Sequence, residues 1–343
     1  MSKKYNTLVY LGRFQPVHNA HLETIKIATK LSDRVIIIIG SADEPRTPKN
    51  PFTSSERETM IHSALADAGI MTFQYKIEHN YDTIYNDVAW ASRVQSLVTK
   101  HTHGIGTTGI IGHDKDASTW YMAMFPQWKT EDVGLIEPLN ATDIRELFFR
   151  PDVNLNFMKH VVPQATYDFL NEFRTRKEFT EMVAEKDFIT EHKKQYAGLR
   201  YPPIFVTVDA CLVQSGHVLM IKRKAIPGKG LWALPGGYVN ANTDASVKDA
   251  MVRELREETG IKVPGPVLMG NIVKEKVFDA VNRSPRGRII THCFRIDLPD
   301  GPLPRVKGED DAEKARWIPI SDIRRDTAFE DHFAMISDML GLA

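Results

Sequence analysis

Residues 236–239 (GGYV) and residues 253–261 (RELREETGI) decide the fold of the second half of the chain. Glu254, Glu257 and Glu258 are spaced i, i+3 and i+4, so a helix places their three carboxylates on one face. Like charges at this spacing destabilise a helix unless a cation neutralises them. Because clustered carboxylate oxygens suit hard divalent ions, the pattern predicts a helix that carries Mg²⁺ or Mn²⁺.

A solvated acidic helix face is the common alternative for such a run of glutamates. The paired glycines upstream and the spacing Arg-Glu-x-x-Glu-Glu-x-Gly weigh against it. A divalent ion held there can bridge a diphosphate and activate water for attack at phosphorus. We predict a helix over residues 246–259 in which Arg253 pairs with Glu257 one turn on, and Gly260 ends that helix.

Strand-like segments surround this predicted helix. A short glycine-containing turn joins residues 204–213 to residues 217–223, which is typical of a β-hairpin. Residues 289–296 and 315–318 are further strand-like segments. Strands and a helix in this order predict an α+β domain with a mixed sheet.

The first 150 residues show a different pattern, in which short apolar runs alternate with helical periodicity. Such alternation favours an α/β fold with a doubly wound parallel sheet and helices on both faces. The predicted strands are residues 6–11, 35–39 and 109–112, and the predicted helices are residues 20–31, 54–68 and 89–99.

The segment between the two halves, residues 160–195, reads as mostly helical and mixed in charge. We interpret it as a solvated connector whose Phe169, Phe173 and Phe179 dock on a neighbouring domain, without a chemical role. The predicted organisation is a first domain at 1–160, a helical extension and linker at 161–199, and a second domain at 200–343.

Composition limits the functional class. The 343 residues exceed what one hydrophobic core usually organises, and the formal net charge is zero, so the basic surplus of a nucleic-acid binder is missing. The aliphatic run 35–39 is too short to span a bilayer, and the chain enters a strand directly, without room for a signal peptide. Cys211 and Cys293 lie in apolar, strand-like stretches, so we expect no disulfide framework and a cytoplasmic location. The sequence does not decide the oligomeric state, and a homo-oligomer is one possibility.

Residues 12–21 (GRFQPVHNAH) lie where a strand turns into a helix, the place where parallel sheets bind phosphates. Gly12 permits close approach of the backbone, and His18 and His21 are spaced so that both rings face the same way. Two such rings can bind nucleotide phosphates and stabilise departing pyrophosphate. Thr142 and Arg145, in residues 140–145 (NATDIR), form a second anion-binding arrangement at a helix start.

These segments, together with residues 50–57 (NPFTSSER), resemble the HxGH nucleotidylyltransferase superfamily, and most closely the archaeal-type nicotinamide-mononucleotide (NMN) adenylyltransferases. Ala20 replaces the usual glycine between the histidines. The resemblance implies attack of the mononucleotide phosphate on ATP carrying Mg²⁺, with His18, His21, Arg145 and Thr142 on the ATP phosphates. It further implies three pocket residues. Arg13 and the main-chain amides around Phe14 line the pocket. Trp90 either stacks on nicotinamide or is a core aromatic. Residues 112–116 are further candidates to line this pocket.

Residues 253–261 resemble the Nudix box and match its second half completely. The first half departs, because Ala245 stands at the expected glutamate, Asp244 is the nearest acid, and a two-residue insertion follows Gly237. The resemblance implies that Glu254 and Glu258 are the main metal ligands, that Glu257 is a third, and that the Gly237 carbonyl is a weaker one. Two other segments fit ADP-ribose-type Nudix enzymes. The first is residues 284–290, although Arg286 and Arg288 there could equally be plain charges on a strand surface. The second is the acidic loop at residues 308–313, in which Glu309 or Glu313 would supply a further base or metal ligand.

Both halves in this order resemble the bifunctional NMN adenylyltransferase/Nudix hydrolases. That resemblance implies synthesis of NAD from ATP and NMN, and metal-dependent hydrolysis of ADP-ribose to AMP and ribose 5-phosphate. The expected partners are therefore small nucleotides, with no nucleic acid and no membrane. Two alternatives remain open: the same chemistries on other substrates, or a Nudix domain that senses a ligand without catalysis. Three crowded glutamates speak against a sensor, and we expect no basic DNA-binding appendage of the kind a Nudix-fold transcription regulator would need.

Overall fold

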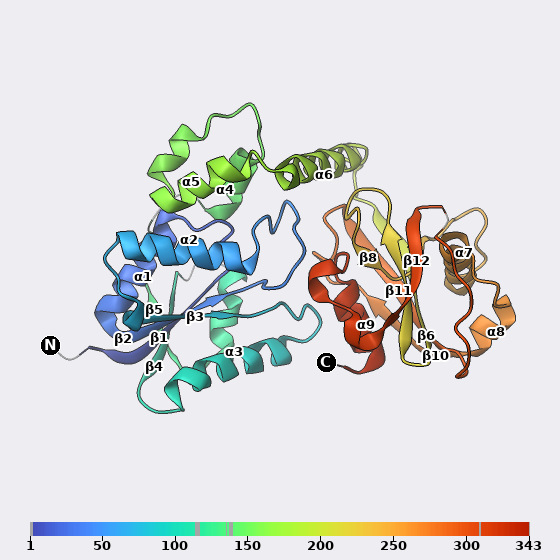
Figure 1. Ribbon diagram of the computed structural model, residues 1–343, viewed down its shortest axis with the longest axis horizontal. Helices are drawn as coiled ribbons and strands as arrows, with labels where there is room; N and C mark the ends of the chain where they lie inside the picture. Colours follow the sequence, from blue (N-terminus) through green and yellow to red (C-terminus); the bar gives the residue numbers. More distant parts are fainter. Residues whose placement is uncertain (1–2, 114–116, 135, 137–139, 309, 343) are drawn as a thin grey trace. The chain divides into compact units, whose positions relative to one another are not determined.

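The computed structural model describes residues 3–113, 117–134, 136, 140–308 and 310–342. The chain forms two compact units, Met1–Val183 and Ala184–Ala343 (Figure 1). The division falls inside helix α6 (Lys177–Lys194) and therefore within the predicted extension and linker at 161–199. No helix in the described part of the chain is both long enough and apolar enough to cross a membrane.

The first unit is built on a parallel sheet with the strand order β3-β2-β1-β4-β5, which confirms the predicted doubly wound α/β fold. Residues 35–39 in β2 are completely buried because both faces of the sheet are covered, as a β-branched run of this kind requires. The strands are β1 (Tyr5–Gly12), β2 (Ser32–Ile39), β3 (Tyr75–His79), β4 (Thr108–Gly112) and β5 (Lys129–Asp132).

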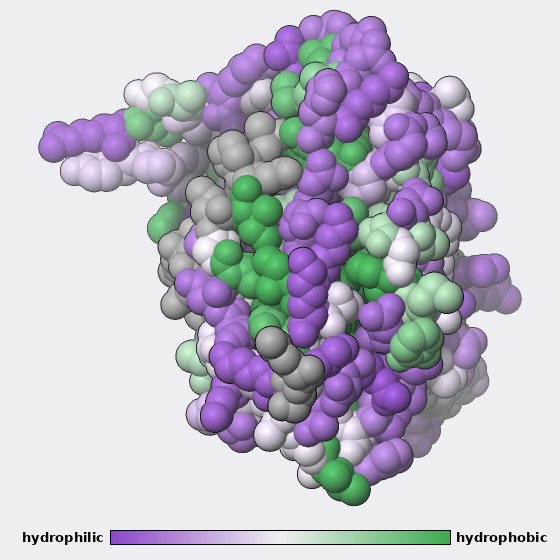
Figure 2. All heavy atoms as spheres, turned by 90° about the vertical axis from the view of Figure 1, so that its left-hand side faces the viewer, coloured by the Kyte–Doolittle hydropathy of each residue, from purple (hydrophilic) through white to green (hydrophobic). Residues whose placement is uncertain are grey.

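Alternate residues of β1 pack against different helices, as the twofold period of a strand dictates. Leu8 and Tyr10 join the core formed with α1 (Asn19–Leu31) and α2 (Ser54–Asp67), whereas Val9 and Leu11 join the core formed with α3 (Asp87–Thr102). Figure 1 shows α1 and α2 on one side of the sheet and α3 on the other. The face in Figure 2 is mostly hydrophilic, with apolar residues gathered near its middle.

The helical segment after α4 (Ala141–Phe148) docks on the first unit through aromatic side chains. Phe173, in α5 (Gln164–Phe173), and Phe179, in α6, are buried in the same core as Phe148, and Phe169 packs at its edge. The predicted docking of these three phenylalanines is therefore observed. Short 3-10 helices complete the connections: η1 (Thr72–Gln74), η2 (Ala117–Met124), η3 (Leu155–His160), η4 (Ile320–Asp322) and η5 (Arg325–Thr327).

The second unit contains the predicted mixed sheet, in the order β10-β11-β6-β7-β12, with β8 paired to β7 and β9 paired to β6. The predicted hairpin is present, because Val213 and Gln214 pair with Val218 and His217. The strands are β6 (Ile204–Gln214), β7 (His217–Arg223), β8 (Trp232–Ala233), β9 (Gly236–Tyr238), β10 (Ile272–Phe278), β11 (Arg288–Asp297) and β12 (Ala312–Pro319).

Helix α7 (Val247–Thr259) carries the predicted cluster of glutamates and contacts β6, β9 and β12, and its apolar residues share one core with residues of β6 and β11. Ser246 caps its first turn by accepting a hydrogen bond from the Asp249 amide, and Gly260 ends it in a left-handed conformation (φ 60°), as predicted. The remaining helices of this unit are α8 (Gly265–Gly270) and α9 (His332–Leu340), and α9 contacts β10 and β11.

Candidate active sites

Hydrogen bonds of a buried side chain hold the loop between β1 and α1 in place. Gln15 is completely buried, and its side-chain amide donates to the Phe52 carbonyl (2.9 Å) and accepts from the Phe52 amide (3.0 Å). Phe14 adopts a positive φ of 52°, and a Cβ on Gly12 would lie 2.9 Å from the end of its ring. Glycine at position 12 is therefore required by this chain's own packing, in addition to any close approach of a ligand.

His18 and His21 lie together at the start of α1, as their spacing predicts. His18 is the N-cap residue, and its main-chain N–H donates to Nδ1 of His21 (3.2 Å). The two rings stack with centroids 3.6 Å apart and an interplanar angle of 28°. His18 is buried and His21 is half-buried, so the pair is held in one orientation at the carboxyl end of β1.

Arg145 reaches the same loop from α4. One terminal nitrogen of its guanidinium group donates to the Gln15 carbonyl (2.7 Å), and the other donates to the Thr142 hydroxyl (3.1 Å). Burial and the nearby positive charge of Arg13 lower the pKa of Arg145 to about 10. The structure thus brings Arg145 and Thr142 to the loop of the two histidines and concentrates positive charge there, which favours an anionic ligand.

Two further cations at this site were missed by sequence reasoning. Lys49 keeps an exposed surface, yet surrounding protein atoms and then Arg13 lower the pKa of its ammonium group, and Arg145 adds to the effect. Arg57 is fully buried and donates to the carbonyls of Arg13 and Gly40 (2.6 Å each), which ties together the ends of β1 and β2. Arg57 lies in the quoted segment 50–57, but no local periodicity marks Lys49.

Trp90 lies on α3 and is half-buried. Its ring centroid is 6.2 Å from that of Tyr121 and 6.1 Å from that of Phe125, at the edge of the core on that face. A half-buried ring fits both predicted roles, as a core aromatic and as a stacking surface. Residues 114–116 of the predicted pocket lining lie outside the described residues.

Glu258 is the most buried acid of α7, with 5% of its surface exposed. Its Oε2 accepts a hydrogen bond from the Gly236 amide (2.9 Å). Burial, with smaller contributions from the negative charges of Glu254 and Asp209, raises the pKa of Glu258 to about 8. A carboxyl group in this environment is costly to ionise unless a cation is close by.

The paired glycines allow β9 to pass between α7 and β6. A Cβ on Gly237 would lie 2.6 Å from the carboxylate of Glu254, and a Cβ on Gly236 would lie 2.1 Å from the Val208 carbonyl oxygen. Both approaches are shorter than real Cβ contacts, so a side chain at either position requires a shift of backbone or carboxylate. The main chain at Gly237 therefore lies directly against one of the predicted metal ligands.

Arg253 gathers the other acids of this segment. It donates to Glu254 (2.8 Å), to Glu257 (2.9 Å) and to both oxygens of Asp244 (2.7 and 2.8 Å). The predicted pairing with Glu257 is observed, and Asp244 ties the preceding loop to the helix. Glu257 remains 47% exposed. Within the described ranges, no three side chains of His, Cys, Asp or Glu are arranged to hold a metal ion.

Asp209 on β6 is a buried acid that sequence reasoning missed. Burial raises its pKa to about 7, and its Oδ2 accepts a hydrogen bond from the Thr291 hydroxyl (2.6 Å). A Cβ on Gly236 would lie 2.8 Å from Oδ1 of Asp209, so this acid borders the same glycine as Glu258.

Two arginines border this region. The Arg223 guanidinium group lies 4.0 Å from the centroid of the Phe329 ring, and burial and then the positive charge of Arg286 lower its pKa. Arg286 donates to Glu330 (3.3 Å) and its side chain is 15% exposed, so a plain surface charge is excluded at this position. Glu309 lies outside the described residues, and Glu313 lies 3.9 Å from the Lys222 ammonium nitrogen.

Comparison with known proteins finds relatives for each part of the chain. Residues 9–146 match the cytidylyltransferase-like family and residues 203–339 match the NUDIX domain. A nicotinamide/nicotinic acid mononucleotide adenylyltransferase of Acinetobacter baylyi is 36% identical over 50% of this chain and 88% of its own length. An ADP-ribose pyrophosphatase of Methanocaldococcus jannaschii is 36% identical over 43% of this chain and 78% of its own.

A solved structure resembles both parts at once. The bifunctional NMN adenylyltransferase/ADP ribose pyrophosphatase of Francisella tularensis, crystallised with AMP and a manganese ion, has a TM-score of 0.90 and 36% identity. The match covers 98% of this chain and 99% of the other. Fold and site therefore define a nucleotidylyltransferase domain followed by a Nudix domain. The chain belongs to the family of bifunctional NMN adenylyltransferase/ADP-ribose pyrophosphatases.

Proposed function

We propose that the chain joins ATP and NMN into NAD and pyrophosphate, and hydrolyses ADP-ribose to AMP and ribose 5-phosphate. The observation that carries the proposal is the match to a bifunctional enzyme over 98% of the chain. The stacked His18–His21 pair in the first unit and the buried Glu258 in the second support it from this chain's own residues.

In the first reaction, a phosphate oxygen of the mononucleotide forms a bond to the α-phosphorus of ATP, and the bond from that phosphorus to the bridging oxygen of pyrophosphate breaks. No covalent enzyme intermediate is needed, so the protein positions the reactants and stabilises charge. His18, His21, Arg145 and Lys49 bind the triphosphate, and His18, His21 and Arg145 meet the negative charge that develops on pyrophosphate. Thr142 and Arg13 line the same pocket.

Trp90 stacks on the nicotinamide ring of the acceptor in this proposal. Its ring, on α3, is only half-buried, as a stacking role requires. The Mg²⁺ that accompanies ATP is borne mainly by phosphate oxygens and water.

In the second reaction, Glu254, Glu258 and the Gly237 carbonyl would hold Mg²⁺ or Mn²⁺. The fit rests on oxygen donors: two carboxylates, one of them buried, beside a main chain whose missing Cβ leaves room for Glu254. When bound, the ion would neutralise the diphosphate and activate water. Glu257 is a third ligand only when it leaves Arg253. Arg223 and Arg286 bind phosphate oxygens of the substrate.

The proposal is tested by supplying ATP with NMN, and separately ADP-ribose with Mg²⁺ or Mn²⁺, and separating the products by chromatography. NAD in the first mixture and AMP in the second are expected. Equal release of AMP by the wild type and by Glu258→Gln removes the assignment of the second site. Competition between NMN and nicotinic acid mononucleotide decides the acceptor.

Two alternatives make different predictions. If both chemistries act on other substrates, another mononucleotide or another nucleoside diphosphate derivative is turned over faster. If the Nudix domain is only a sensor, ADP-ribose binds without being cleaved. The two buried free thiols, Cys211 and Cys293, suit the reducing cytoplasm in which we place the enzyme. Light scattering measures whether it is a homo-oligomer.

A further inference from the structure

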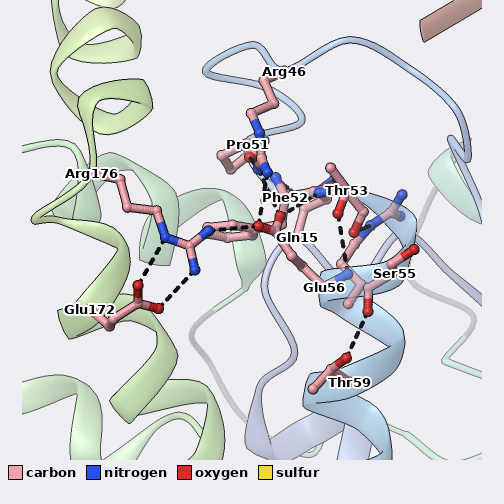
Figure 3. Close-up of polar contacts among 11 residues, drawn as sticks. Gln15, Arg46, Pro51, Phe52, Thr53, Ser55, Glu56, Thr59, Glu172 and Arg176 are labelled. Atoms are coloured by element: carbon pink, nitrogen blue, oxygen red, sulfur yellow. Dashed lines mark hydrogen bonds and ion pairs between the residues drawn. The ribbon is translucent and has the colours of Figure 1, made fainter.

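Glu56, in the first turn of α2, lies at the centre of an ionic cluster in the first unit (Figure 3). Its two carboxylate oxygens accept hydrogen bonds from both terminal nitrogens of Arg46 (2.7 and 2.8 Å). The same carboxylate accepts from Arg176 (2.9 Å) and from the Thr53 amide (2.8 Å). Burial works to raise the pKa of Glu56, but the hydrogen bonds from Arg46 and Thr53 lower it, so the group is ionised.

Arg176 reaches this carboxylate from the connection between α5 and α6. Its side chain is held in place by Glu172, which accepts two hydrogen bonds from it (2.8 and 3.0 Å). Its guanidinium group also lies 5.0 Å from the ring centroid of the fully buried Phe173. Arg176 is therefore pre-oriented toward Glu56, so little side-chain entropy is lost in making the bond.

Arg46 connects Glu56 to the loop that precedes α2. It donates to the Pro51 carbonyl (2.7 Å) in addition to Glu56. Between Arg46 and Pro51, the main chains of Thr47 and Asn50 close a tight turn through two hydrogen bonds (3.0 and 3.3 Å). Lys49 lies inside this turn, so the Arg46–Glu56 ion pair anchors the base of the turn that carries Lys49.

The turn that carries Lys49 lies beside the loop of the two histidines. Phe52, next to Pro51, exchanges two hydrogen bonds with Gln15 (2.9 and 3.0 Å), and the Gln15 carbonyl accepts one from Arg145 (2.7 Å).

Neighbouring cations repel Lys49 in this position. The positive charges of Arg13 and Arg145 act on its ammonium group, only partly offset by Asp82 and Glu44. Before an anionic ligand binds, like-charge repulsion favours a loop position farther from the phosphate site. An ion-pair network that fixes the base of the turn opposes this movement.

We propose that Arg176 and Glu56 are positioning residues that hold Lys49 at the phosphate site of the first domain. The inference rests on the proposed adenylyl transfer at that site and goes beyond it. It gives a role in the first reaction to the helical segment after α4, which sequence reasoning treated as a connector without chemistry. Arg176 acts through Glu56 and Arg46 and does not itself touch substrate.

The first experiment compares Arg176→Met with Lys177→Met in the full-length protein. Lys177 follows Arg176 as the first residue of α6 and makes an exposed pair with Glu181 (2.8 Å), so its substitution is a matched control that also removes one positive charge. We expect Arg176→Met to raise KM for ATP about tenfold with kcat within about twofold, because a lost ground-state contact changes binding rather than chemistry. Lys177→Met and hydrolysis of ADP-ribose should match the wild type.

The second experiment separates positioning from general stability. KM for ATP is measured for Lys49→Met and for Lys49→Met combined with Arg176→Met. If Arg176 acts through Lys49, the second substitution adds no further rise in KM. Independent rises that multiply overturn the proposal, and so does a KM for Arg176→Met equal to that of Lys177→Met.

Arg176→Lys is the second variant, for use if Arg176→Met does not fold. It keeps the charge but loses the two-nitrogen fork, so a smaller rise in KM is expected. A wild-type protein that forms no NAD and binds no ATP overturns both the proposed function and this inference. A wild type that forms NAD, with Arg176 variants that match Lys177→Met, overturns this inference alone.

Discussion

The imidazole rings of His18 and His21 stack with their centroids 3.6 Å apart, and the His18 main-chain N–H donates to Nδ1 of His21. Because Nδ1 of His21 accepts this bond, the neutral ring that fits carries its proton on Nε2. His21 is thereby set up as a hydrogen-bond donor at the carboxyl end of β1. The position of the ring and the direction of this hydrogen bond both suit a phosphate ligand.

Replacing His21 by alanine should reduce kcat of NAD formation about 100- to 1,000-fold, the usual effect of losing one donor to a developing anion. The rate is measured from ATP and NMN by chromatography. His103→Asn is the control, because His103 is exposed and in a left-handed conformation (φ 51°) that asparagine tolerates. A His21→Ala enzyme as active as this control contradicts the assignment.

The glutamates of α7 should differ in importance because they differ in burial. Glu258→Gln should lower ADP-ribose hydrolysis at least about 100-fold by removing a buried charge from the site. Glu257 is 47% exposed and paired with Arg253, so Glu257→Gln should cost less than about tenfold. AMP release is measured for both, with NAD formation as an internal control. Equal losses in the two variants argue that Glu257 and Glu258 are equivalent ligands.

The raised pKa of Glu258 predicts how stability without metal depends on pH. The folded pKa is about 8 and the ordinary value is 4.5, so the folded state holds the extra proton. The stabilisation from this group is complete below the ordinary pKa and is lost as pH rises toward 8, by a few kcal/mol in all. Manganese favours the ionised carboxylate, so it should raise the melting temperature more at pH 8 than at pH 5.

The melting temperature is measured with and without Mn²⁺ at several pH values, for the wild type and for Glu258→Gln. The variant should show a weaker fall with pH and a smaller response to manganese. If both proteins respond alike, Glu258 is not the group that binds the ion.

Gly237→Ala tests the close approach of β9 to α7. Because the new Cβ would lie 2.6 Å from the Glu254 carboxylate, either the strand or the carboxylate has to move. We expect hydrolysis of ADP-ribose to fall at least about tenfold, since small misplacements at an active site are costly. NAD formation should not change. The same substitution at Gly270, where a Cβ meets nothing within 4 Å, is the control.

Phe173→Ala tests the docking of α5 on the first unit. The ring is fully buried against Phe52 and Phe148, so its removal should lower the free energy of unfolding by about 3–5 kcal/mol. Urea unfolding of the full chain measures the loss. Phe188→Ala is the comparison, because Phe188 is 39% exposed and its loss should be much smaller.

The elements that were predicted correctly have a strong local pattern. The β-branched run in β2 and the apolar faces of α1, α2, α3 and α7 follow directly from periodicity. β3, β5 and β10 were not predicted, and all three are edge strands. β5 is polar throughout (KTED), and β10 carries three consecutive charged residues in its middle (IVKEKVF). An edge strand buries little apolar surface, so its sequence shows little of the pattern that marks a central strand.

The candidate sites divide in the same way. His18 with His21 and Glu254 with Glu258 were found because each pair lies within one helical turn, where spacing alone sets proximity. Lys49, Asp209 and Arg223 were missed because each meets its neighbours only after distant segments pack together.

The amino-acid sequence by itself therefore determined the kinds of secondary structure, the two domains' fold classes and the chemical groups within each short motif. These features depend on interactions between residues a few positions apart, and the spacing along the chain sets those interactions directly. Only the tertiary structure decided that Arg145 reaches Gln15 and that Arg176 reaches Glu56, 130 and 120 positions away in the chain. Such contacts depend on how whole helices and strands pack, because packing sets the direction in which each long side chain can extend.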